Sequence, residues 1–180
     1  MARHSMQTQL ELRMALKHPL TVFLLLIASW AHLALAQPYP RIENLSKVDL
    51  TYMEQQRNDL RAIAATNLGR QFSGQRERDI ALLQNMLEQG LVGPDQVSEM
   101  QAMGIMMGDL LAAEFDMNWV VYTDQAGRSR ALRYQDSDFF LYPVTMISRR
   151  RTAGDMTAVS GIYERAARLV KANTPARPFQ

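Results

Sequence analysis

The sequence predicts an α+β domain, and three observations carry this prediction. Apolar residues recur at three- and four-residue steps between residues 47 and 115, which is the period of amphipathic helices. Segments rich in β-branched and aromatic residues follow between residues 119 and 142, separated by turn residues. Hairpin loops as short as these leave no room for the crossovers of a parallel sheet, so a Rossmann-type sheet is not expected. We therefore expect three N-terminal helices, a three-stranded antiparallel meander and one C-terminal helix.

The first two helices have recognisable ends. Ser46 can cap the first helix because its side-chain oxygen can accept an early backbone N–H, and Asp49 adds an acid that the helix dipole favours. The apolar face of this helix ends at Gly69, and glycine commonly terminates helices. The second helix is expected over residues 76–89, with Gly90 as its stop.

The third helix, expected over residues 96–115 with Asp95 as its cap, contains two glycines. Gly104 and Gly108 lie four residues apart near the edge of its apolar arc, whereas Asp109 falls on the opposite side. Glycine inside a helix costs about 1 kcal/mol relative to alanine, so two of them require a reason. We expect another element of the fold to approach the helix closely at this point.

The first two strands are joined by a tight turn. Asp124 can bond the backbone two residues further on, and Gly127 can take a positive φ. Trp119, at the start of the first strand, is interpreted as a core anchor rather than a sugar-stacking platform. The expected strands are residues 119–123, 130–134 and 139–142.

The end of the domain is less regular. Pro143 limits the third strand, and residues 144–147 either continue it or form a short turn. Asp155 can cap a last helix whose apolar face extends to Val170. The resulting organisation is a leader (1–36), an extended lead-in (37–46), a single α+β domain (47–172) and a flexible tail (173–180).

The leader has the three parts of a secretory signal peptide. Lys17 supplies a positive start, residues 20–30 form a short apolar core, and an Ala-x-Ala end at Ala36 precedes Gln37. A membrane anchor is the competing interpretation, but residues 20–36 number 17, and a spanning helix needs about 20. We expect cleavage between Ala36 and Gln37 and a periplasmic or secreted protein, which would contact the membrane only through an uncleaved leader.

Removing the leader changes both charge and chemistry. It holds three of the 20 basic and one of the 18 acidic residues, which leaves 17 of each and a formal net charge of zero. A neutral domain gives no reason to expect nucleic-acid binding. The leader also holds all three histidines, and the chain has no cysteine. Ser-His-Asp and Cys-His catalysis, a thiol nucleophile and the usual zinc ligands are therefore excluded from the mature chain.

Several motifs stand in a characteristic order between residues 77 and 171. They are Leu83-Gln84-x-x-Leu87, Met103-Gly104-x-x-x-Gly108-Asp109, Trp119, Asp124-x-x-Gly127-Arg128 and Pro143-Val-Thr-Met-Ile-Ser-Arg149-Arg150. On these motifs the chain resembles a bacterial family of small, often exported domains of unknown function, although that family more often has leucine at the position of Met103. The resemblance implies an α+β fold and supplies no catalytic, cofactor-binding or metal-binding residues.

Two groups of side chains could bind metal ions. Methionines of the third helix could offer thioether sulfur to Cu(I), and aspartates near the hairpin ends could offer oxygen to Ca²⁺. Methionine on an apolar arc is usually core filler, and the aspartates lack the spacing of a calcium loop, so we expect no metal and no cofactor. The side chains are those of Met100, Met103, Met106 and Met107, and of Asp124, Asp136 and Asp138.

Paired carboxylates are the catalytic set that the missing histidines leave readily open. Glu114, Asp116 and Asp124 lie closest to an expected cleft edge and could serve glycoside hydrolysis, with one acid and one base or nucleophile. Carboxylates at helix ends and turns are common without catalysis. The chain is therefore interpreted as a non-enzyme without catalytic residues, with the hydrolase kept as an alternative.

Arginines supply the candidate binding face. They could pair with the carboxylate or phosphate groups of an anionic envelope polymer or an acidic partner protein. The alternative is a solvated strand end that supplies partners for the 17 acids. The residues are Arg149, Arg150 and Arg151, joined by Arg128, Arg130 and Arg133.

These observations predict an exported, non-enzymatic domain that binds another envelope component, most simply a protein. A carboxylate-based envelope hydrolase and an immunity-type protein that blocks a periplasmic toxin are the alternatives. A cleft with paired acids and one raised pKa would favour the hydrolase, whereas an arginine-rimmed patch without such a cleft would favour a binder. The sequence does not specify the oligomeric state.

Overall fold

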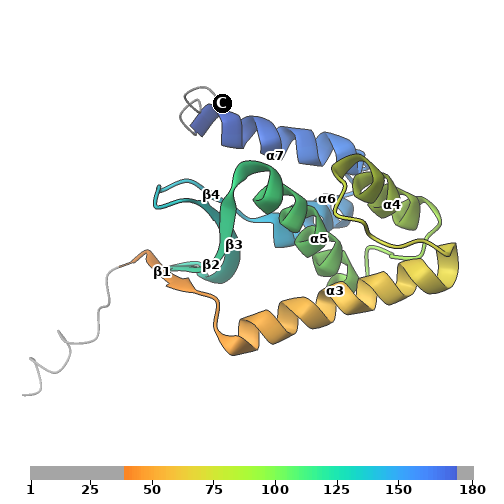
Figure 1. Cartoon of the computed structure of the whole chain (residues 1–180), viewed down its shortest axis with the longest axis horizontal. Coiled ribbons are helices and arrows are strands. Elements are labelled where there is room, and N and C mark those ends of the chain that lie inside the picture. Colours follow the sequence, from red (N-terminus) through yellow and green to blue (C-terminus); the bar gives the residue numbers. More distant parts are fainter. Residues whose placement is uncertain (1–38, 174–180) are drawn as a thin grey trace, which may run out of the picture. The chain divides into compact units, whose positions relative to one another are not determined.

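A four-stranded antiparallel sheet and five α-helices make up residues 39–173, the part of the chain that the computed structural model describes (Figure 1). The predicted α+β class is confirmed. The predicted leader, its cleavage between Ala36 and Gln37, and the tail beyond Asn173 lie outside the described residues. In chain order the elements are β1 (Arg41–Asn44), α3 (Lys47–Leu68), α4 (Arg76–Glu88), α5 (Val97–Phe115), β2 (Met117–Asp124), β3 (Gly127–Tyr134), β4 (Phe140–Leu141), the 3₁₀ turn η1 (Pro143–Thr145), α6 (Met146–Thr152) and α7 (Val159–Asn173).

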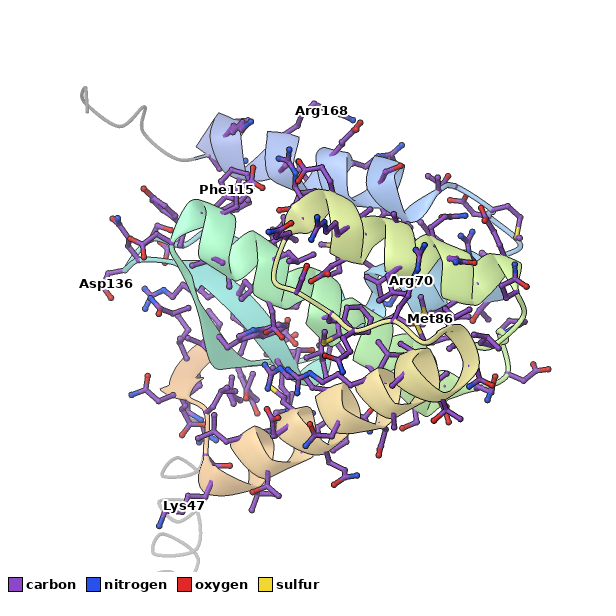
Figure 2. The ribbon with its side chains drawn as sticks, turned by 45° about the vertical axis from the view of Figure 1, so that its right-hand side comes forward. Lys47, Arg70, Met86, Phe115, Asp136 and Arg168 are labelled. Atoms are coloured by element: carbon purple, nitrogen blue, oxygen red, sulfur yellow. The ribbon has the colours of Figure 1, made fainter. Side chains whose placement is uncertain are left out.

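Helix α5 is the centre of this unit. It contacts α3, α4, α6, α7 and the sheet, and ten of its 19 residues are buried, including all four of its methionines. A helix that is apolar over most of its circumference is one that the rest of the fold surrounds. Met86 of α4, labelled in Figure 2, is fully buried in the same core.

The two glycines of α5 allow close approach of other elements. A Cβ added at Gly104 would lie 2.5 Å from the carbonyl oxygens of Pro143 and Val144, and one added at Gly108 would lie 2.5 Å from Cζ2 of Trp119. Real Cβ atoms essentially never come within 3.0 Å of such neighbours. The 3₁₀ turn η1 and strand β2 are therefore seated directly on the helix backbone, which is the close approach that the sequence predicts.

The sheet is a meander in the order β1-β2-β3-β4. Strands β2 and β3 pair along their whole length up to Asp124 opposite Gly127. Asp124 Oδ1 accepts the N–H of Ala126 at 2.8 Å, and Gly127 has a φ of 125°, so the turn is built as its sequence predicts. Strand β4 pairs with β3 only at Leu132 and Arg133. Residues 127–131 of β3 therefore have no strand partner on that side within residues 39–173, and we call this part the open edge of β3.

The prediction of three strands is wrong by one. Residues 41–44, within the expected extended lead-in, form β1 and pair with β2 from Arg41 opposite Thr123 onward. This segment has a single apolar residue, Ile42, so it carries no alternating pattern. The segment is a strand because its backbone pairs with the edge of β2. The position of that edge cannot be read from the few residues of the segment itself.

The prediction of one C-terminal helix is also wrong. The third strand ends before Pro143, as predicted, and of the two alternatives for residues 144–147 the turn is found. The chain then continues into α6 (Met146–Thr152) before α7. Proline has a fixed φ and no N–H, both of which suit the first position of a helical turn. Helix α7 begins at Val159, not near Asp155. Asp155 instead accepts hydrogen bonds from the backbone N–H and the hydroxyl of Thr157, at 2.9 and 2.6 Å.

Between residues 39 and 173, none of the helices combines the length and the apolar content that crossing a membrane demands.

Candidate functional site

The strongest candidate site is a cavity of about 400 Å³ between the open edge of β3 and the segment that contains η1 and α6. We call it the arginine groove. One wall carries Arg128 and Arg130 of β3, and the opposite wall carries Val144, Thr145 and Arg149. The aromatic rings of Tyr122 and Tyr142, 5.8 Å apart and edge to face, also line it.

A buried carboxylate holds two of these arginines. Asp49 of α3 has a side chain only 2% exposed, and it accepts hydrogen bonds from Arg128 Nη2 at 2.6 Å and Arg130 Nε at 3.1 Å. The backbone N–H and the hydroxyl of Ser46 also donate to it, at 3.0 and 2.6 Å. The hydrogen bond from Arg128, followed by those from Ser46, holds the pKa of Asp49 well below its usual range against the opposing effect of burial.

The same carboxylate closes the capping box of α3. The N–H of Asp49 donates to Ser46 Oγ at 3.2 Å while the carboxylate accepts from the N–H of Ser46. The start that the sequence predicts for this helix is therefore confirmed. What the sequence does not predict is that this capping acid also anchors β3, because local spacing gives no information on a partner 79 residues away.

The three arginines that line the groove differ in how many hydrogen bonds and ion pairs their guanidinium groups form within the protein. Arg130 directs two nitrogens to Asp49, and its guanidinium lies 4.2 Å from the centre of the Tyr52 ring. Arg128 uses one nitrogen on Asp49, and its side chain is 47% exposed. Arg149 is exposed and forms no ion pair with any residue that the structure describes. Arg128 and Arg149 thus retain N–H donors that face the groove.

The run of three arginines in α6 does not form one face. Arg151 is buried and donates to the backbone oxygens of Asp155 and Thr157, at 2.7 and 3.1 Å. Arg150 donates to the backbone oxygen of Met146 at 2.7 Å. Their guanidinium groups therefore hold α6 and the loop that follows it. Only Arg149 joins the groove.

Arg133, the remaining member of the predicted basic face, serves a turn. It donates to the backbone oxygens of Asp136 and Ser137, both at 2.8 Å, and its guanidinium lies 5.7 Å from the centre of the Phe140 ring. These contacts close the connection between β3 and β4. Arg133 does not line the arginine groove.

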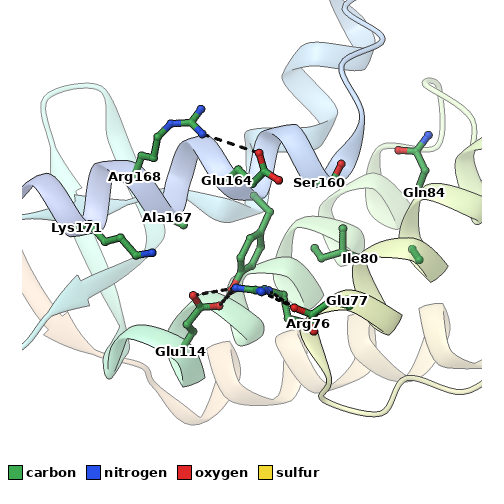
Figure 3. Close-up of a pocket in the computed structure, with 12 residues that line it drawn as sticks. Arg76, Glu77, Ile80, Gln84, Glu114, Ser160, Glu164, Ala167, Arg168 and Lys171 are labelled. Atoms are coloured by element: carbon green, nitrogen blue, oxygen red, sulfur yellow. Dashed lines mark hydrogen bonds and ion pairs between the residues drawn. The ribbon is translucent and has the colours of Figure 1, made fainter. Parts of the chain in front are cut away.

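A second cavity, of about 640 Å³, lies between α4, α7 and the end of α5, and Figure 3 shows its lining side chains. We call it the helical groove. Arg76 contacts Glu114 at 3.2 Å and also pairs with Glu77, and the hydroxyl of Tyr163 donates to Glu114 at 2.7 Å. Burial, and then Glu114, raise the pKa of Tyr163 above its ordinary value. Arg168 also pairs with Glu164, and three acids line this groove beside its three cations.

The three carboxylates considered for hydrolysis are not brought together. Glu114 lies in the helical groove, Asp124 lies in the arginine groove, and Asp116 is exposed at the C-terminal cap of α5 with a φ of 55°. The carboxyl pKa shifts found among the described residues are all downward, at Asp49, Glu77 and Asp155. Glu114, Asp116 and Asp124 therefore do not form a catalytic pair of the kind that glycoside hydrolysis uses.

The side chains considered as metal ligands lie in two different settings. Met100, Met103, Met106 and Met107 are packed in the core. Asp124 is the last residue of β2, opposite Gly127 at the start of β3, while Asp136 follows the other end of β3. No cluster of three or more acidic, histidine or cysteine side chains suited to a metal ion occurs within residues 39–173.

The motif residues outside the groove form a structural network. Asp109 of α5 accepts from Arg57 Nε and Nη2, at 2.7 and 2.9 Å, and from the indole N–H of Trp119 at 3.0 Å. The ring of Trp119 lies against Gly108, and the residue packs on the core cluster. Trp119 therefore ties β2 to α5.

Comparison with known proteins supports the fold and the resemblance to an uncharacterised family. Residues 79–163 match the model of a family described as a domain of unknown function, DUF3806. A crystal structure from Bacteroides thetaiotaomicron VPI-5482 is similar, with a TM-score of 0.65 and 20% sequence identity over 74% of this chain and 49% of the other. At that identity the likeness shows the fold alone, and this chain spans about half the length of that protein. No curated protein matches the chain significantly.

Proposed function

We propose that this chain is an exported, non-enzymatic domain that works by binding another protein of the cell envelope. The observation that carries the proposal is the arginine groove. Arg128 and Arg149 present guanidinium N–H donors to an open cavity, and such donors pair with the carboxylates of a partner.

The export half of the proposal is supported by the sequence of the leader. A positive start, an apolar core and an Ala-x-Ala end precede Gln37. The binding half is supported by the chemistry that remains after the leader, because the mature chain has no histidine and no cysteine. The separation of Glu114 from Asp124 also removes support from a carboxylate-based hydrolase. An immunity-type protein would be one form of the proposed binder.

Export can be tested by expressing the full chain with a C-terminal tag in a Gram-negative host. We expect the tagged protein in the periplasmic fraction, with a first residue of Gln37 by peptide mass mapping. A matched variant with Ala34→Arg and Ala36→Arg should stay uncleaved, because the peptidase site needs small residues. A wild-type chain that keeps residues 20–36, or that stays in the cytoplasm, would contradict the proposal.

Binding can be tested by affinity capture from the native envelope, followed by mixing the purified chain with each captured protein. We expect at least one envelope protein to bind the purified chain with a defined stoichiometry in isothermal titration calorimetry. Failure of every captured protein to bind the purified chain would contradict the proposed function.

A further inference from the structure

We propose that the open edge of β3 binds an extended, acidic segment of the partner protein as an added strand, with Arg128 and Arg149 pairing with its carboxylates. This inference rests on the proposed function and specifies how the arginine groove would recognise a partner. It is carried by two independent features of the groove, the backbone of β3 and the charges on either side of it.

The first feature is a row of backbone groups without a strand partner. Alternate residues of a strand direct their N–H and C=O groups to opposite sides. The N–H of Tyr134 is bonded on the side of β4, at 3.3 Å, so Leu132, Arg130 and Arg128 direct theirs to that side as well. Pairing with β4 stops at Leu132. The outer N–H and C=O groups of Arg130 and Arg128 consequently have no strand partner among residues 39–173.

An unpaired strand edge is a template for another strand. Partners that bind in this way gain affinity from main-chain hydrogen bonds and specificity from side-chain pockets beside the edge. Here the cavity lies directly along the open part of β3, because Ser129 and Arg130 line one wall and Val144 and Thr145 line the other. Its volume of about 400 Å³ lies within the usual range of about 300–1,000 Å³ for ligand sites.

The second feature is the charge of the groove. Arg149 has no ion-pair partner in the described part of the chain. Arg128 donates to Asp49 through one of its guanidinium nitrogens. Asp124 accepts the N–H of Ala126 in its own turn and is one acid against the three arginines that line the groove. Guanidinium groups on both walls favour a segment that carries acidic side chains. The helical groove is less cationic, since its three acids match its three cations and Arg76 and Arg168 already pair with acids there.

The test is a selection of random seven-residue peptides, displayed without charged flanks, against the purified mature chain. We expect the selected peptides to be enriched in aspartate and glutamate and to bind Arg149→Glu at least ten-fold more weakly than wild type. Arg165→Glu is the matched control, because Arg165 is also exposed on a helix, lines neither groove and has no ion pair within residues 39–173. This control should bind like wild type, and both variants should keep the wild-type melting temperature.

The strand geometry is tested with the best selected peptide. N-methylation of alternate peptide amides should abolish binding in one of the two registers, since it removes the hydrogen bonds to β3. Amide hydrogen exchange at Arg128 and Arg130 should slow when the peptide is bound. The proposal would be overturned by a selection that yields no peptide, by neutral or basic peptides, by binding that tolerates N-methylation in both registers, or by protection elsewhere.

The outcomes separate this inference from the proposed function. An envelope partner that binds Arg149→Glu as tightly as wild type, without protecting β3, would overturn the strand-addition proposal and leave the binding function standing. A chain that is not exported and captures no partner would overturn the binding function, whatever the peptides do.

Discussion

Asp109 and Trp119 are joined by a hydrogen bond of 3.0 Å from the indole N–H to the carboxylate, which fastens strand β2 to helix α5. The same carboxylate receives two nitrogens of Arg57 from α3. The carboxylate of Asp109 thus connects α5 both to the strand that follows it and to α3, whose Arg57 lies 52 residues away in the sequence. Asp109 and Trp119 belong to the motifs by which the chain resembles a family of domains of unknown function.

Replacing Asp109 with alanine should therefore destabilise the fold. The change leaves the guanidinium of Arg57 and the indole of Trp119 without their acceptor, and hydrogen bonds to charged groups contribute about 1.5–3 kcal/mol each. Because Arg57 regains some water, we expect a loss of about 2 kcal/mol in the free energy of unfolding. Trp119 is the single tryptophan after the leader, so its fluorescence during urea unfolding measures this directly. Asp59→Ala removes an exposed acid of α3 whose side chain accepts a hydrogen bond from Gln55 and forms no ion pair within residues 39–173, and it should change stability by less than about 0.5 kcal/mol.

Gly104→Ala should be destabilising even though alanine is the better helix former. The added Cβ meets two backbone oxygens at 2.5 Å, and the backbone cannot move aside as a flexible side chain would. Overpacking of this kind typically costs about 1–3 kcal/mol, which exceeds the gain of about 1 kcal/mol in helix propensity. Thermal unfolding measures the net effect. Gly93→Ala is the control, because its Cβ would meet only Gln96 Oε1 at 3.6 Å. A stabilised Gly104→Ala variant would refute the close packing of η1 on α5.

The contribution of Asp49 to stability should depend on acid pH. Its pKa is lowered in the folded state, so its stabilisation is complete above the unfolded pKa of about 3.9 and is lost as the pH falls below that value. Asp49→Asn removes the charge that Arg128 and Arg130 share. We expect the variant to be about 2 kcal/mol less stable than wild type between pH 5 and 7, and this difference to shrink at pH 3. Urea unfolding at each pH measures it, and a difference that stays constant with pH would argue against a charged Asp49.

Tyr163 should impose the opposite dependence at alkaline pH. Its pKa is raised in the folded state, so its stabilisation is complete below the unfolded pKa of about 10 and is lost as the pH rises above that value. Tyr163→Phe removes this titration together with the hydrogen bond to Glu114. We expect the variant to lose about 1 kcal/mol at pH 7 and to show a shallower decline of stability than wild type above pH 10. Equal slopes for both proteins would mean that Tyr163 ionises freely in the fold.

The sequence predicts those parts of the fold whose cause is local. The capping of α3 by Ser46, the turn at Asp124 and Gly127, and the requirement for close approach at Gly104 each follow from a few neighbouring residues. Strand β1 and helix α6 are missed because their cause is distant. Residues 41–44 need the edge of β2, and α6 needs the surface of α5 and the carbonyl groups that Arg151 binds.

The candidate site is predicted only in part for the same reason. Arginine content indicates a basic face, but the sequence does not tell which guanidinium groups have internal partners. The structure assigns Arg150, Arg151 and Arg133 to backbone carbonyl groups, and Arg130 to Asp49. Acceptors in loops cannot be located from spacing along the chain. Arg149 and Arg128 are set apart only once the tertiary contacts are known.

The missing side chain at Gly104 sets the width of the arginine groove. Because α5 has no Cβ there, η1 rests on its backbone, and η1 supplies the Val144 and Thr145 wall that faces β3. A larger residue at position 104 would push η1 away from α5 and so change the distance between that wall and the strand edge. The dimensions of the surface groove thus depend on packing in the interior of the protein. Core substitutions along α5 would change the size of the segment that the groove can bind.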